Sequence, residues 1–155
     1  MPLELRQWQI EAYEKFVEND CRGIIKVATG KGKTLFGIHC ILELKKKDEN
    51  LKVCIIVPTI DLMNQWKKDL VKYGIPGYEI GFYYGKEKQD DKNIIIFVQS
   101  SASDYFSYEF LANYFDFMIA DECHHYGTKK SKEMFNNNIP FRLGLSATPE
   151  RHNDP

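Results

Sequence analysis

The 155-residue sequence lacks an excess of charge of either sign, because 21 lysine and arginine residues nearly balance 22 aspartate and glutamate residues and leave a net charge of −1. This balance argues against a protein that coats nucleic acid by charge alone, since such proteins are strongly basic. No apolar run approaches the roughly 20 residues that span a bilayer, and no signal-peptide core follows Met1. We therefore expect a cytoplasmic or nucleoid-associated protein without a membrane partner, whose contacts with any nucleic acid are local.

The sequence also has few cysteines, at positions 21, 40, 54 and 123, and no C-x-x-C pair. Disulfide frameworks and tetrahedral zinc sites both require several such side chains at characteristic spacings. Two histidines follow Cys123, but no second cluster of cysteine and histidine completes a ligand set. We therefore expect reduced, buried cysteines and no zinc site.

Apolar runs rich in β-branched residues alternate with segments of helical periodicity along the whole chain. Strands are expected in the run that ends at Val27 and over 52–57, 79–84, 93–98, 117–120 and 141–145, and helices over about 6–19, 34–47 and 59–73. We predict no helix or strand in the charged connection 86–92 or in the aromatic region 105–115. Continuous apolar strands alternating with helices predict a single α/β domain over residues 1–155, with a mainly parallel sheet covered by helices on both faces.

The segment from Val27 to Thr34 reads V-A-T-G-K-G-K-T and lies between an expected strand and an expected helix. Its glycines allow backbone N–H groups to turn inward around an anion, and the helix directs its positive end to the same place. The Lys33 amine can then reach terminal phosphates, and the Thr34 hydroxyl can ligate Mg²⁺. The full phosphate-loop pattern has glycine where Val27 stands, so a surface turn is the alternative. The predicted phosphate-binding residues are Thr29, Gly30, Lys31, Gly32, Lys33 and Thr34.

Asp121 and Glu122 follow the apolar run 117–120. Phosphoryl transfer requires a carboxylate that holds magnesium and a group that orients the attacking water. We therefore expect Asp121 to ligate Mg²⁺ and Glu122 to act as general base on water. An acidic turn after a strand is the alternative, which the phosphate loop around Lys33 makes less favourable. The predicted catalytic residues are Lys33, Asp121 and Glu122, and the predicted cofactors are ATP and Mg²⁺.

Clusters of polar residues follow five of the expected strands. In open α/β sheets, ligands bind beyond the carboxyl ends of the strands, where these clusters would lie. Four segments, VATGKGKT from Val27, VPTIDLMNQW from Val57, DECHH from Asp121 and LGLSATPER from Leu143, resemble motifs I, Ia, II and III of superfamily 2 helicases, in the same order. The Asp-Glu-Cys-His segment is similar to that of the DEAH-like group, which includes xeroderma pigmentosum B-type repair helicases and restriction-enzyme motor subunits. The resemblance implies a RecA-like P-loop NTPase domain.

This resemblance also implies roles for residues outside the predicted nucleotide chemistry. It assigns adenine recognition to Gln9, for which an exposed position on a helix is the alternative. It assigns coupling between ATP and the neighbouring domain to His124, Ser146 and Thr148, although histidines such as His124 are common at protein surfaces. It assigns contacts with a nucleic-acid strand, through hydroxyl and amide groups that need no net charge, to Thr59, Gln65, Gln99 and Ser100. Thr59 can also cap the helix that follows it.

The expected function is that of the ATP-binding first motor domain of a superfamily 2 helicase or translocase, which couples ATP hydrolysis to strand movement or unwinding, with DNA favoured over RNA. In that family a second RecA-like domain supplies arginines to the ATP site, and these 155 residues stop before it. We therefore expect the full-length protein to carry that second domain and the isolated domain to be nearly inactive. The alternatives are a nucleotide-dependent regulatory module without motor activity and a P-loop kinase of small molecules. Glu122 and the Ser-Ala-Thr segment favour the motor.

Overall fold

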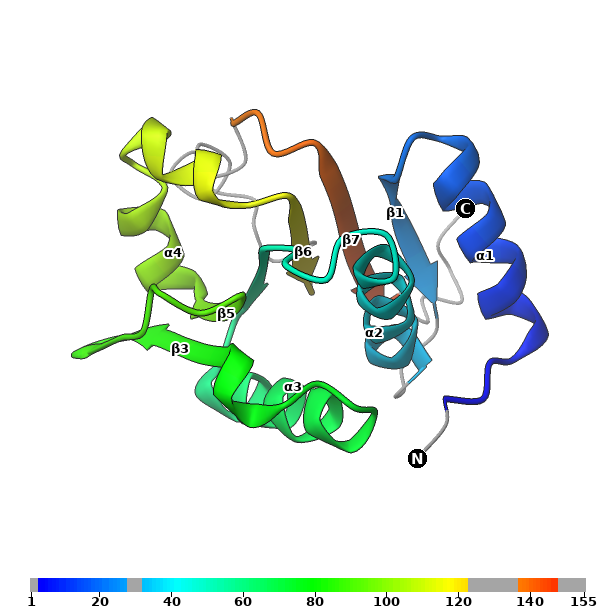
Figure 1. Ribbon diagram of the computed structural model, residues 1–155, viewed down its shortest axis with the longest axis horizontal. Helices are drawn as coiled ribbons and strands as arrows, with labels where there is room; N and C mark the ends of the chain where they lie inside the picture. The colour runs from blue at the N-terminus through cyan, green and yellow to red at the C-terminus, as the bar shows by residue number, and fades with distance from the viewer. Residues whose placement is uncertain (1–2, 28–31, 123–136, 148–155) are drawn as a thin grey trace, which may run out of the picture.

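The computed structural model describes residues 3–27, 32–122 and 137–147 (Figure 1). Every predicted helix and strand is confirmed, with ends that differ by at most two residues. The elements, in chain order, are α1 (Gln7–Glu18), β1 (Arg22–Val27), α2 (Gly32–Lys45), β2 (Val53–Val57), α3 (Ile60–Lys72), η1 (Gly77–Glu79), β3 (Ile80–Tyr84), β4 (Glu87–Lys88), β5 (Ile94–Val98), α4 (Gln99–Tyr105), η2 (Glu109–Tyr114), β6 (Phe117–Asp121) and β7 (Phe141–Ala147).

The strands form one sheet in the order β1-β7-β6-β2-β5-β3-β4. All neighbouring pairs are parallel except β3 and β4, so the predicted mainly parallel sheet is confirmed. In the register of the central strands, Val57 pairs with Val98 and Asp121 pairs with Leu145. The carboxyl ends of the parallel strands therefore meet at one edge, where the polar motifs begin.

Both faces of the sheet are buried, as a parallel sheet requires. Side chains alternate along β2, so Ile55 and Val57 pack in a core with α1, α2 and α3, whereas Cys54 and Ile56 pack in a second core with α4 and η2. Figure 1 shows α3 and α4 on opposite sides of the sheet. The prediction of helices on both faces is thus confirmed.

Helix α3 has the local signals that the sequence predicted for it. The Thr59 hydroxyl accepts a hydrogen bond of 3.2 Å from the Leu62 amide, which makes Thr59 the N-cap. Gly74 follows the helix with a φ of 109°, and its N–H donates to the Val71 carbonyl. Both ends of this helix are therefore fixed by short-range chemistry.

The sequence does not predict four short elements, β4, α4, η1 and η2, because they are too short to show a period. Strand β4 lies within the charged connection and pairs with β3, and the Gln89 side chain accepts a hydrogen bond from the Phe82 amide. Helix α4 begins directly at Gln99, with no loop after β5, and packs Tyr105 against Phe97 at a ring distance of 4.9 Å. The predicted aromatic region therefore forms the core of the second face.

The cysteines that the structure describes agree with the sequence prediction. Cys21, Cys40 and Cys54 are buried and free, and burial raises the pKa of each thiol. Cys123 lies outside the described residues. None of the helices in the described ranges is both long and apolar enough to cross a membrane.

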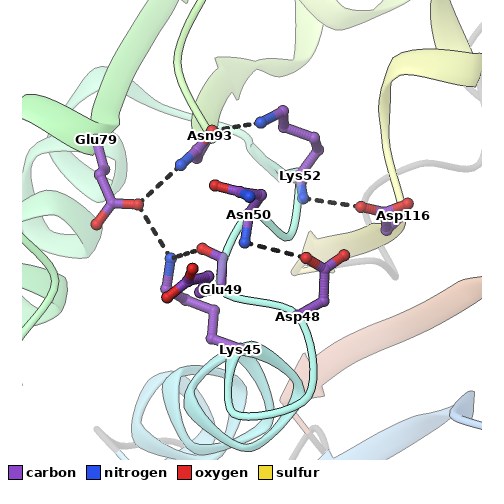
Figure 2. Close-up of polar contacts among 8 residues, drawn as sticks. All are labelled: Lys45, Asp48, Glu49, Asn50, Lys52, Glu79, Asn93 and Asp116. Carbon is purple, nitrogen blue, oxygen red and sulfur yellow. Dashed lines mark hydrogen bonds and ion pairs between the residues drawn. The ribbon is translucent and has the colours of Figure 1, made fainter.

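A chain of polar contacts joins the elements at the opposite edge of the sheet, where the strands begin (Figure 2). Glu79 accepts hydrogen bonds from the Lys45 amine, at 3.0 Å, and from the Asn93 amide, at 2.8 Å. Lys52 extends the chain: its amine donates to Asn93 at 2.6 Å and its backbone N–H donates to the Asp116 carboxylate at 3.0 Å. These contacts connect the end of α2 to the starts of β2, β3, β5 and β6.

Replacing Glu79 with glutamine is expected to lower the free energy of unfolding at neutral pH by about 1 kcal/mol, the size of a partly exposed ion pair with one added hydrogen bond. Burial alone would raise the pKa of Glu79, but the hydrogen bonds from Asn93 and Lys45 outweigh burial and lower it. A lowered pKa stabilises the fold above the usual carboxyl pKa, and this stabilisation is lost as the pH falls below it.

Urea denaturation at pH 7 and pH 3 tests this expectation. The difference between the wild-type chain and Glu79→Gln should be present at pH 7 and small at pH 3. Glu43→Gln is the control, because its partner Lys46 has a side chain that is 72% exposed and such pairs stabilise little. An equal loss from both substitutions at pH 7 would contradict a specific role for Glu79.

Candidate nucleotide-binding site

The three residues predicted to be catalytic meet at the carboxyl edge of the sheet. Lys33 lies in the first turn of α2, only 7% exposed, and Asp121 is the last residue of β6. The Lys33 amine lies 3.5 Å from Asp121 Oδ1 and contacts Glu122 Oε1 directly. Lys33 thus forms one charged cluster with Asp121 and Glu122, which follow it by 88 and 89 positions in the sequence.

Asp121 is almost completely enclosed, with 1% of its surface exposed. The indole N–H of Trp66 on α3 donates a hydrogen bond of 2.8 Å to Asp121 Oδ2, while Oδ1 faces Lys33. Burial raises the pKa of the Asp121 carboxyl, and the Trp66 hydrogen bond and the Lys33 charge oppose this rise. The carboxylate is therefore oriented by one hydrogen-bond donor from α3 and by the charge of a lysine from α2.

Glu122 follows Asp121 with a backbone φ of 55°, in the left-handed region that non-glycine residues rarely adopt. Such a conformation costs about 1 kcal/mol or more and persists where the surrounding structure imposes it, often at functional sites. The Glu122 carboxylate contacts the Lys33 amine, which Asp121 also faces. The Glu122 side chain keeps 19% of its surface exposed, so solvent can reach this carboxylate.

Gln9 links helix α1 to the start of α2. Its side chain is 1% exposed, so the alternative of an exposed position is wrong. The amide oxygen accepts from the Arg6 backbone N–H at 2.7 Å, and the amide nitrogen donates to the Gly32 carbonyl at 2.8 Å. Gln9 therefore lies beside the predicted phosphate loop, and adenine recognition by its amide stays a prediction.

The residues predicted to contact nucleic acid lie at or near the same edge. Thr59 follows β2 and Ser100 follows β5, and both residues are exposed. Because β2 and β5 pair with each other, the two hydroxyl residues lie at neighbouring strand ends. Gln99 begins α4 and is half-buried. Gln65 lies further along α3, exposed, and donates to the Asp69 carboxylate at 3.1 Å. Three of the four residues thus gather at this edge, and Gln65 lies beyond the first turn of its helix.

The remaining predicted residues are only partly covered by the structure. Ser146 is 5% exposed and lies inside β7, beside Lys26 of β1, rather than after the strand as the sequence suggested. The predicted phosphate-loop and coupling residues outside the described ranges are Thr29, Gly30, Lys31, His124 and Thr148. Their roles stay predictions.

The donors at this edge fit a magnesium nucleotide. Mg²⁺ prefers oxygen ligands, usually one or two carboxylate or hydroxyl groups with the remainder from phosphate and water. Asp121 supplies a buried carboxylate, and Thr34 supplies a hydroxyl in the first turn of α2. Lys33 supplies a positive charge for phosphate at the same helix end.

Trp66 contacts the predicted site, but the sequence assigns it no role. It is the last residue of the segment that resembles motif Ia, and its spacing from Met63 and Leu70 places it on the buried face of α3. A buried tryptophan needs an acceptor for its indole N–H. That rule predicts a polar partner, but the sequence cannot identify it as Asp121, 55 positions away.

The sequence matches one family over nearly its whole length. The family described as "Type III restriction enzyme, res subunit" matches residues 2–151. The DNA 3'-5' translocase XPB2 of Sulfurisphaera tokodaii is 38% identical over 152 residues, which cover 96% of this chain and 32% of XPB2. The chain therefore spans about a third of this relative.

Solved structures show the same fold. The UvsW helicase from bacteriophage T4 is similar with a TM-score of 0.74 at 25% identity, over 92% of this chain and 52% of that one. The SWI2/SNF2 ATPase core of Sulfolobus solfataricus, determined in complex with dsDNA, also has a TM-score of 0.74, at 20% identity, over 94% of this chain and 32% of that one. The RecA-like fold that the motifs predicted is confirmed.

Proposed function

This chain belongs to the type III restriction enzyme res subunit family, and we propose that it is the ATP-binding motor domain of a superfamily 2 DNA helicase or translocase. The resemblance to superfamily 2 helicases is confirmed by the family match and by the XPB2 relative. The observation that carries the proposal is the convergence of Lys33, Asp121 and Glu122 at one edge of the sheet. Those groups are the cation, metal ligand and base that phosphoryl transfer needs.

In the proposed site, Lys33 exchanges one anionic partner for another. The Lys33 amine contacts the Glu122 carboxylate. A bound triphosphate offers oxygens of higher charge to this amine, so Glu122 is released from it and becomes available to take a proton from water. Bound Mg²⁺, held by Asp121 and Thr34, would neutralise charge on the phosphates. Binding of ATP thus prepares the base for hydrolysis.

DNA is the proposed partner, and the proposal rests on relatives and on the exposed edge. XPB2 is named a DNA translocase, and the SWI2/SNF2 core was determined with dsDNA. The exposed hydroxyls of Thr59 and Ser100 lie at adjacent strand ends and can contact phosphates without strong net charge. We expect such a protein to act in the cytoplasm.

The 155-residue chain is expected to hydrolyse ATP very slowly by itself. We infer that a second RecA-like domain in the full-length protein supplies arginines to the site, and an arginine finger raises turnover by about 10³- to 10⁵-fold in NTPases. Steady-state ATP hydrolysis, measured with and without single-stranded DNA, checks this. Robust DNA-stimulated turnover by the 155 residues, abolished by Lys33→Ala, would show that they form a complete motor.

The proposed function is tested directly by nucleotide binding. A fluorescent ADP analogue should bind the 155-residue chain, and added Mg²⁺ should strengthen its binding. A single-stranded oligonucleotide should bind more weakly to a chain with Thr59→Ala and Ser100→Ala. Lys47→Ala serves as the control, because this lysine is exposed and follows the end of α2 at the opposite edge of the sheet, where the strands begin. Absence of nucleotide binding by a folded wild-type chain would overturn the proposal.

A further inference from the structure

Trp66 connects helix α3 to the carboxylate at the end of β6. Its side chain is 1% exposed, and the only polar atom of the indole donates to Asp121 Oδ2 at 2.8 Å. Asp121 Oδ1, on the other side of the carboxylate, faces the Lys33 amine at 3.5 Å. The indole thus determines which oxygen of Asp121 faces the nucleotide site.

The packing around the indole is specific to this position. A Cβ added at Gly37 on α2 would lie 2.8 Å from Trp66 Cη2, closer than side chains tolerate, and 3.4 Å from Leu145 Cδ1. Glycine at 37 therefore leaves the space in which the ring packs against α2. Because the ring is buried in the core and lies against α2, Trp66 has little freedom to swing away from Asp121.

We propose that Trp66 is a positioning residue for the magnesium site, which holds Asp121 so that Oδ1 is presented to the metal and Oδ2 is engaged by the indole; this rests on the proposed function. Hydrogen bonds to a ligating carboxylate fix its orientation, and their removal typically weakens metal binding by about 10- to 100-fold. Thr59 is the N-cap of α3, so this helix joins the proposed nucleic-acid edge to the metal ligand.

Trp66→Phe tests the proposal, because it removes the N–H and keeps an aromatic ring. Binding of Mn²⁺ to the ADP-saturated chain is measured by electron paramagnetic resonance, and affinity for ADP is measured in EDTA. The substitution is expected to weaken Mn²⁺ binding by about tenfold or more. Affinity for metal-free ADP should change by less than about twofold, because Trp66 is proposed to act only through Asp121.

Leu70→Ala is the matched control. Leu70 is fully buried on the same face of α3, so its truncation removes packing but no hydrogen bond to Asp121. The control should be less stable than the wild type and bind Mn²⁺ normally. Equal weakening by both variants, or unchanged Mn²⁺ binding in Trp66→Phe, would overturn the inference while leaving the proposed function intact. A wild-type chain that binds no ADP would overturn both.

A second measurement uses the fluorescence of Trp66, which is not substituted in this experiment. The chain has two tryptophans, so Trp8→Phe leaves Trp66 as the sole tryptophan, which can be excited apart from the tyrosines. Addition of Mg²⁺ to the ADP-bound Trp8→Phe chain is expected to change the emission of Trp66, because the acceptor of its N–H becomes a metal ligand. The change should disappear when Asp121→Asn is added. Emission that does not respond to Mg²⁺ while the metal strengthens ADP binding would overturn the positioning role.

Discussion

Replacement of Glu122 with glutamine is expected to lower ATP turnover by about 10²- to 10⁴-fold, the usual contribution of a general base. Glutamine has nearly the same shape as glutamate but cannot accept a proton from water. The side chain is 19% exposed at the end of β6, so water can reach it once the Lys33 amine is drawn to phosphate. The loss should therefore appear in the rate of hydrolysis.

Nucleotide affinity is expected to respond differently to the same substitution. The Glu122 carboxylate contacts the Lys33 amine and would compete with phosphate for it. Glutamine is neutral and competes less, so ATP should bind at least as tightly to Glu122→Gln as to the wild type. A large fall in turnover together with retained binding is the combination that distinguishes a base from a phosphate ligand.

Steady-state hydrolysis by the full-length protein with DNA present, and binding of a fluorescent ATP analogue, measure these two quantities. Glu79→Gln is the matched control, since Glu79 precedes β3 at the opposite edge of the sheet, where the strands begin. It should leave turnover near the wild-type value. If Glu122→Gln hydrolyses ATP at the wild-type rate, another group activates the water.

Local chemistry explains why much of this fold could be predicted from the sequence. The cap at Thr59 and the positive φ of Gly74 depend on residues within a turn of one helix. The phosphate loop follows a strand with Ile24, Ile25 and Val27, and the Asp121-Glu122 pair follows the continuous apolar run 117–120; such runs are local signals. Their convergence follows from the rule that ligands lie beyond the carboxyl ends of parallel strands.

The contacts that could not be predicted join distant parts of the chain. Trp66 and Asp121 are 55 positions apart, and Gln9 and Gly32 are 23 apart. A single sequence shows that the Trp66 ring is buried and that Gln9 is polar, but not which acceptor either reaches. Strand order and helix packing decide those pairings, and they arise from the whole core rather than from any one segment.

Replacement of Lys33 with methionine is expected to weaken nucleotide binding and to slow hydrolysis by about 10²- to 10³-fold, the loss that follows removal of one group that stabilises developing charge. Methionine fills similar space without a charge. The amine is the cation that the structure places against both Asp121 and Glu122, at the start of the helix after the phosphate loop. Without it, the phosphates lose a charged donor and face two carboxylates.

The same substitution is expected to destabilise the nucleotide-free fold. Asp121 is 1% exposed and the Lys33 side chain 9% exposed, and removal of one partner from such a buried pair costs up to about 3 kcal/mol. Protonation of Asp121 limits the cost, because burial already raises its pKa.

Urea denaturation and titration with a fluorescent ADP analogue measure the two effects, and Lys86→Met, which replaces an exposed lysine, is the control. Since Lys33 contributes both to the apo fold and to phosphate binding, Lys33→Met should lose stability without ligand and should gain less than the wild type on addition of ADP. Equal stabilisation of the two proteins by ADP would mean that Lys33 neutralises the carboxylates but does not bind the nucleotide.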